Sequence, residues 1–269
     1  MNYLKLEIFS AINIVIMFFV FKFLKKKDLN NKQVALVFMT FSLLTVFTHY
    51  IDIIVSLLNG HAYTLQNLPN IYFLPVYPCN IMMWLNVIMI PLMFKRGKFC
   101  QFLANFIFFI GSGCAFFGLI LNENFLSNPN FLDLYSLKAI VSHVFLLYAC
   151  ISLKVFNVFK IQTIQSVLSG LFGIFIFLIS NIYTNAILKK LNRETVDSLF
   201  TKGLNDQFKF INFYSIIVIA LIILIVVTTI YETKVYPLKE RWYYRLKERR
   251  EENYDWFFKK IIFIRNIWT

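Results

Sequence analysis

Seven runs of apolar residues dominate this chain, and each is close to the length needed to cross a membrane. An α-helix rises about 1.5 Å per residue, so about 20 apolar residues span a hydrocarbon core of about 30 Å. A helix also satisfies its own backbone hydrogen bonds, as lipid requires. The runs predict helices over Leu6–Leu24, Val34–Leu58, Tyr77–Phe94, Phe99–Leu121, Leu134–Phe156, Ile161–Ile187 and Phe210–Tyr231. We therefore expect an all-α, polytopic membrane protein with about seven transmembrane helices.

The composition agrees with this fold class. Of the 269 residues, 59% are hydrophobic and only 15% are charged, which leaves too little polar surface to cover a water-soluble globule. No hydrophilic stretch is long enough for an independent domain. The chain is thus predicted to comprise a transmembrane domain over residues 1–233 and a basic, amphipathic cytoplasmic tail over residues 234–269.

The positions of the basic residues predict the orientation in the membrane. Most of the 27 Lys and Arg residues fall in the first, third and fifth loops and in the tail, and cytoplasmic loops hold the excess of positive charge. This places the N-terminus outside and the C-terminus inside a cell membrane. The basic residues that give the net charge of +13 lie mostly where this rule requires them, so we expect no nucleic-acid partner. The sequence does not identify a protein partner.

The segment from Lys239 to Arg250 interleaves Trp242, Tyr243 and Tyr244 with charged residues. Such a segment can lie on anionic lipid headgroups, with its aromatic rings at the membrane interface. The alternative is that it serves only as a topology anchor.

Four polar residues lie where lipid should exclude them, within or at the edge of the predicted helices. Such residues usually face the protein interior or a water-filled cavity, and they are the first place to look for function. At 1.5 Å per residue, His49, Asp52, Cys79 and His143 all fall in the outer half of the membrane. His49 and Asp52 are three residues apart and therefore share a helix face, where they either form a functional pair or only tie two helices together.

Cys79 and His143 could together support nucleophilic catalysis. A thiol is a good nucleophile only as thiolate, and a nearby imidazole can take its proton. Cys79 would attack a lipid ester, His143 would act as base and then acid, and Asn80 or a backbone N–H near Pro78 would stabilise the oxyanion. The structural alternatives are a buried thiol and a core histidine.

The four cysteines are scattered singly, without a C-x-x-C pair, so the sequence predicts neither a disulfide framework nor a metal finger. We expect no cofactor. A zinc-dependent lipid hydrolase stays an alternative, since His49, Asp52 and His143 could in principle hold a metal, although a third buried His is absent. A transporter or solute-binding membrane subunit, with the same polar groups along a pathway, is the other alternative.

Three stretches carry a family resemblance. They are Leu74 to Asn80 (LPVYPCN), Gly111 to Gly118, and Ser142-His143 followed by Leu146 and Ala149. Together they resemble the bacterial YwaF-like integral membrane proteins, which are related to the transmembrane protein 164 acyltransferases. The resemblance implies seven helices and acyl transfer between phospholipids carried by Cys79 and His143. The chain departs from the family pattern at Tyr77, where the family has a His two residues before the Cys.

Overall fold

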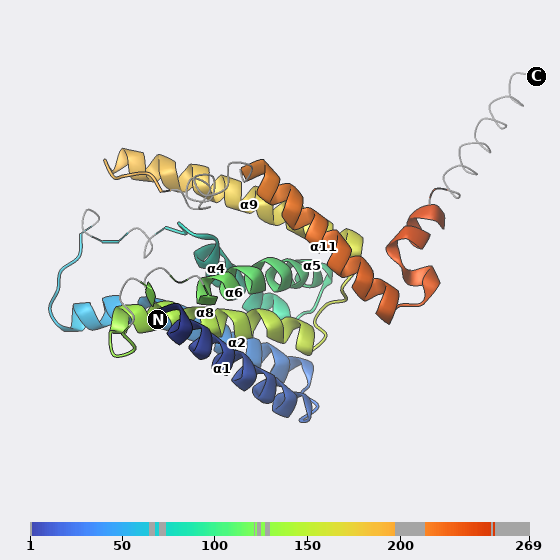
Figure 1. The fold of residues 1–269 in the computed structure, drawn as a ribbon, viewed down its shortest axis with the longest axis horizontal. Helices are drawn as coiled ribbons and strands as arrows, with labels where there is room; N and C mark the ends of the chain where they lie inside the picture. Colours follow the sequence, from blue (N-terminus) through green and yellow to red (C-terminus); the bar gives the residue numbers. More distant parts are fainter. Residues whose placement is uncertain are drawn as a thin grey trace, which may run out of the picture.

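The computed structural model describes residues 2–64, 68–69, 74–120, 122, 125–126, 130–196, 213–248 and 250, and it is an all-α bundle (Figure 1). Its long helices are α1 (Asn2–Lys25), α2 (Asn31–Leu58), α4 (Pro78–Met93), α8 (Leu134–Val155), α9 (Thr163–Lys190) and α11 (Phe213–Val235). A further span is built from α5 (Lys98–Phe106), a π-helical turn η1 (Ile107–Gly111) and α6 (Ser112–Ile120). The described residues contain no strand.

Six of these spans are long and apolar enough to cross a membrane, and α4, with 16 residues, is a shorter apolar helix. The prediction of an all-α, polytopic membrane protein is confirmed. Every predicted apolar run corresponds to an observed helix. The predicted tail continues through a 3-10 turn, η2 (Leu238–Glu240), and a helix over 242–248, while 251–269 lie outside the described residues.

Local sequence signals explain where several helices begin. Asn30 caps α2, because its side chain accepts from the backbone N–H of Gln33 at 3.0 Å and the Gln33 side chain accepts from the backbone N–H of Asn30 at 2.9 Å. Asp133 caps α8 by accepting from the backbone N–H of Ser136 at 2.9 Å. Pro78 begins α4, where its missing N–H costs nothing.

The core forms where α8 packs against α2 on one side and α6 on the other. Two glycines of the α6 span allow close approach of α8, as small residues do between membrane helices. A Cβ at Gly111 would lie 2.7 Å from the Cys150 sulfur, and one at Gly118 would overlap the ring of His143. On the far side of α4, α5 and α6, α9 packs against α11 (Figure 1).

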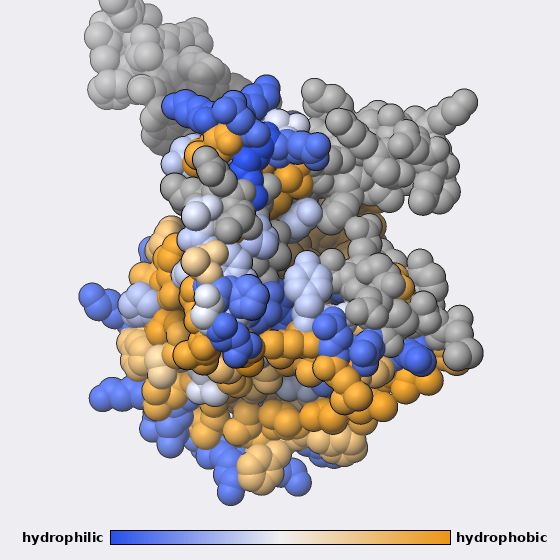
Figure 2. Space-filling model, turned by 90° about the vertical axis from the view of Figure 1, so that its left-hand side faces the viewer, coloured by the Kyte–Doolittle hydropathy of each residue, from blue (hydrophilic) through white to orange (hydrophobic). Residues whose placement is uncertain are grey.

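Hydrophobic side chains cover the flanks of the bundle. Figure 2 views the left-hand end of Figure 1, with hydrophobic residues along the sides and hydrophilic ones near the middle of that end. Exposed apolar residues on α1 and α11 include Phe18, Phe19, Ile222 and Ile223. Such a large apolar exterior is suited to lipid and not to water.

Candidate functional site

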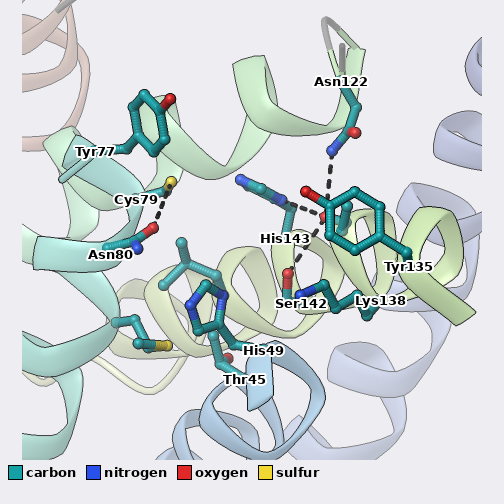
Figure 3. Close-up of a pocket in the computed structure, with 13 residues that line it drawn as sticks. Thr45, His49, Tyr77, Cys79, Asn80, Asn122, Tyr135, Lys138, Ser142 and His143 are labelled. Carbon is teal, nitrogen blue, oxygen red and sulfur yellow. Dashed lines mark hydrogen bonds between the residues drawn. The ribbon is translucent and has the colours of Figure 1, made fainter. Parts of the chain in front are cut away.

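A polar cavity of about 180 Å³ opens between α2, α4 and α8, within the apolar bundle (Figure 3). Four of the five residues predicted as functional line it: His49 from α2, Cys79 and Asn80 from α4, and His143 from α8. The fifth, Asp52, reaches the cavity wall through an ion pair described below. Helices distant in sequence therefore bring these groups to one place. Other lining residues are Thr45, Tyr77, Met83, Asn122, Tyr135, Lys138, Ala139, Ser142 and Leu146.

The thiol of Cys79 sits at the N-terminus of α4, directly after Pro78. The cap residue Tyr77 makes no side-chain capping hydrogen bond, but its carbonyl oxygen accepts from the backbone N–H groups of Asn80 at 3.0 Å and Ile81 at 3.2 Å. Since Pro78 has no N–H, the first turn offers the backbone N–H of Cys79. Partial burial of the Cys79 thiol opposes its ionisation, and the positive end of the helix dipole offsets part of that cost. The Cys79 thiol donates to the side-chain oxygen of Asn80 at 3.3 Å, which holds the sulfur at the cavity edge.

The ring of His143 lies across the cavity from Cys79, directed towards it (Figure 3). Its Nδ1 lies 2.5 Å from the backbone carbonyl oxygen of Ala139. Because a carbonyl can only accept, the neutral ring carries its proton on Nδ1 and leaves the lone pair on Nε2. The same carbonyl also accepts from Asn122 and Ser142, each at 3.3 Å. Several donors thus converge on one oxygen, and this arrangement orients the imidazole as a base.

Asp52 forms an ion pair with Lys138 of α8, with 2.6 Å between Oδ2 and Nζ. The side chain of Lys138 is only 4% exposed and that of Asp52 19% exposed. The Lys138 ammonium also lies 4.8 Å from the ring centre of Tyr135, within the range of a cation–π interaction. Sequence reasoning counted Lys138 only among the basic residues of the outer side. Its position one turn inside a predicted apolar helix was the available signal.

His49 lies on the same face of α2 as Thr45 and lines the cavity with it. Its ring packs edge-on against Tyr50, with 4.9 Å between the ring centres. All four cysteines carry free thiols, and Cys79 is the one that lines the cavity. Among the described residues, no three His, Cys, Asp or Glu side chains are grouped so as to hold a metal ion.

The comparison with protein families adds to this geometry. The model of the TMEM164 family matches residues 3–231 of the chain. The chain belongs to the TMEM164 family. No match to the chain is found among curated proteins or among solved structures. The sequence resemblance to transmembrane protein 164 is therefore confirmed at the level of the family.

The match to the TMEM164 family includes every segment that lines the cavity. It ends at Tyr231, directly before the buried carboxylate of Glu232. The chain is thus a multi-pass membrane protein of this family, with a polar, thiol-containing cavity in its α2–α4–α8 core.

Proposed function

We propose that this protein is an acyltransferase of the cell membrane that moves an acyl chain between phospholipids. Cys79 is the nucleophile and His143 is the general base and acid. The observation that carries the proposal is the shared cavity, in which a thiol at a helix N-terminus lies across from an imidazole whose Nε2 has the lone pair. These are the groups that nucleophilic acyl transfer requires.

The first half-reaction forms a thioester. Nε2 of His143 takes the thiol proton as the sulfur of Cys79 attacks the ester carbonyl of a donor phospholipid. The carbonyl oxygen becomes an oxyanion beside the backbone N–H of Cys79, with the side-chain amide of Asn80 next to it. When the oxyanion collapses, the ester C–O bond breaks, and the protonated His143 gives its proton to the departing lysophospholipid.

The second half-reaction returns the enzyme to its starting state. The hydroxyl of an acceptor lysophospholipid loses its proton to His143 and attacks the thioester carbonyl. A new ester C–O bond forms, the C–S bond breaks, and the thiolate of Cys79 takes the proton back from His143. The cavity of about 180 Å³ is smaller than the roughly 300–1,000 Å³ of pockets that enclose a whole ligand. It has room for the reacting ester and glycerol, while the acyl chains stay in the bilayer.

We further propose that the tail rests on anionic headgroups of the inner leaflet. Its helix over 242–248 exposes Tyr243, Leu246, Lys247 and Glu248, and Lys239 and Glu240 are exposed just before it. An aromatic and an apolar side chain interleaved with charged ones are typical of a segment that lies in the interface plane.

Acyl exchange by the purified protein in liposomes tests the proposal. The donor is a phospholipid with an isotopically labelled acyl chain, the acceptor is a lysophospholipid, and mass spectrometry follows the label. Replacing Cys79 with Ala should abolish exchange, and His143→Gln should slow it by about 10²- to 10⁴-fold, the usual contribution of a general base. Cys100→Ala is the matched control, since Cys100 is buried in α5 away from the cavity. Equal exchange by Cys79→Ala and the unaltered protein would refute the mechanism.

A further inference from the structure

Lys138 places a buried positive charge in the wall of the candidate site. Its side chain is 4% exposed, yet it lines the same cavity as Cys79 and His143. A buried ammonium is costly, and its ion pair with Asp52 offsets only part of that cost. A pair that merely joined α2 to α8 could be replaced by apolar packing at little cost. The cavity position of the ammonium therefore suggests a ligand.

A second polar side chain lies at the cavity with Lys138. The ammonium of Lys138 and the imidazole of His49 both border the cavity (Figure 3). The Lys138 ammonium donates to the Asp52 carboxylate at 2.6 Å, which fixes the position of its charge. A lysine fixed in this way is a common contact for a phosphate oxygen.

We propose that Lys138 binds the phosphate of the phospholipid substrate, with His49 completing this subsite and Asp52 positioning the ammonium. This inference rests on the proposed acyl transfer and names the group that the enzyme recognises. The ion pair of Lys138 and Asp52 has no net charge. A zwitterionic phospholipid has none either, because its headgroup amine compensates the charge of the phosphate, so its binding adds no net charge to the site.

The spacing along α8 matches the layout of a phospholipid. Lys138 precedes His143 by five residues, which corresponds to about 7.5 Å along the helix axis and about 140° around it, and both side chains line the same cavity. Lys138 is also nearer the beginning of α8, and thus nearer the end of the bundle. In a glycerophospholipid, about five covalent bonds of roughly 1.5 Å each separate the phosphorus from the central ester carbonyl, with the phosphate closer to the membrane surface. A phosphate at Lys138 therefore leaves the ester near His143 and Cys79.

Binding of uncleavable lipids tests the proposal separately from acyl transfer. The probes are a dialkyl ether phosphatidylcholine, which has the phosphate but no ester, and the matching dialkylglycerol, which has neither. Native mass spectrometry of the full chain in detergent measures the affinity for each. We expect the phosphate-containing probe to bind at least tenfold more tightly. Equal affinity for the two probes would overturn the proposal without any substitution.

Substitutions then assign the preference to Lys138. Lys138→Gln should reduce the preference for the phosphate-containing probe to about twofold or less, while the exposed Lys190→Gln, at the end of α9, should preserve it. The double variant Lys138→Met with Asp52→Leu removes both charges at once and so avoids a lone buried carboxylate. It should bind dialkylglycerol as the unaltered protein does and lose the preference. A retained preference in either variant would refute the role of Lys138.

Two further outcomes separate this proposal from others. Displacement of the ether phospholipid by millimolar inorganic phosphate would assign the subsite to a soluble anion and overturn the lipid assignment. If the unaltered protein transfers no acyl chain but shows a Lys138-dependent preference for the phosphate probe, the proposed chemistry fails and the phosphate subsite stands. If acyl transfer occurs and Lys138→Gln keeps the preference, the proposed chemistry stands and the phosphate subsite at Lys138 fails.

Discussion

Gly118 of α6 lies directly against the ring of His143 of α8, so that a Cβ at Gly118 would overlap the imidazole. On the other side of the ring, the hydrogen bond between Nδ1 and the carbonyl oxygen of Ala139 fixes its rotation. The imidazole is thus held between a glycine and a backbone acceptor. Its orientation depends on a residue that has no side chain and takes no part in the chemistry.

This packing predicts that Gly118→Ala reduces acyl exchange. The added methyl group must displace the ring, which costs about 1–3 kcal/mol of stability as overpacking does and moves Nε2 from its position. We expect at least a tenfold loss of exchange in liposomes. Gly113→Ala is the matched control on the same helix, because a Cβ there meets nothing within 4 Å. Full exchange by Gly118→Ala would show that the orientation of His143 does not matter.

The ion pair between Asp52 and Lys138 predicts strongly non-additive effects on stability. Asp52→Leu leaves the ammonium buried without its 2.6 Å partner, and breaking such a pair costs about 3–5 kcal/mol. Lys138→Met alone should cost a similar amount. The double variant should recover most of the loss, because no unpaired charge remains. Denaturation of all four proteins in the same detergent measures the coupling, and additive losses would contradict a direct interaction.

The cap of α8 predicts a pH-dependent contribution to stability. Ser136 donates to the Asp133 carboxylate through its backbone N–H at 2.9 Å and its hydroxyl at 2.7 Å, and these bonds lower the pKa of Asp133. Because the pKa is lower in the folded state, the stabilisation is complete above the unfolded value of about 3.9. It is lost as the pH falls through the folded value.

Asp133→Ala should therefore lower the thermal midpoint clearly at pH 7, and the difference from the unaltered protein should shrink as the pH falls below about 4. Thermal scans in detergent across this range measure it. Glu194→Ala, an exposed acidic residue after α9, is the control and should show little difference at any pH. A difference for Asp133→Ala that stays constant down to pH 3 would contradict the assigned hydrogen bonds.

The helices could be predicted from the sequence because lipid imposes a simple length rule. The observed α2 ends at Leu58 and α8 begins at Leu134, as the apolar runs predicted. The start of α4 at Pro78 also followed from local chemistry, since proline suits the first turn. These signals depend only on residues that are close together in the chain, so they can be read from a single sequence.

The partners within the site could not be predicted in the same way. The sequence marked Asp52 as a polar group at membrane depth and suggested His49 as its neighbour, because spacing on one helix is readable. The ion pair with Lys138 joins α2 to α8 across 86 positions in the chain. Likewise, nothing in the sequence says that Gly118 faces His143. Both contacts depend on how the helices pack against one another.

Glu232 is a further buried carboxylate, among the described residues, whose role the sequence did not reveal. It is fully buried near the end of α11, where its Oε1 accepts from the backbone N–H of Thr163 at 2.6 Å and its Oε2 from that of Trp242 at 2.7 Å. Arg245 approaches Oε1 to 3.7 Å. One side chain therefore joins the end of α11, the beginning of α9 and the helix of the tail.

Replacing Glu232 with Gln should release the tail while the bundle stays folded. The amide can accept with only one of its two terminal atoms, so the N–H of Thr163 or of Trp242 loses its acceptor, at a cost of about 1.5–3 kcal/mol for a hydrogen bond to a charged group. We expect trypsin to cleave after Arg245 and Lys247 at least tenfold faster. Glu240→Gln, which changes an exposed carboxylate of η2, should be cleaved at the original rate. Because cleavage of a transiently opened segment follows the population of the open form, unchanged proteolysis of Glu232→Gln would mean that the carboxylate does not hold the tail.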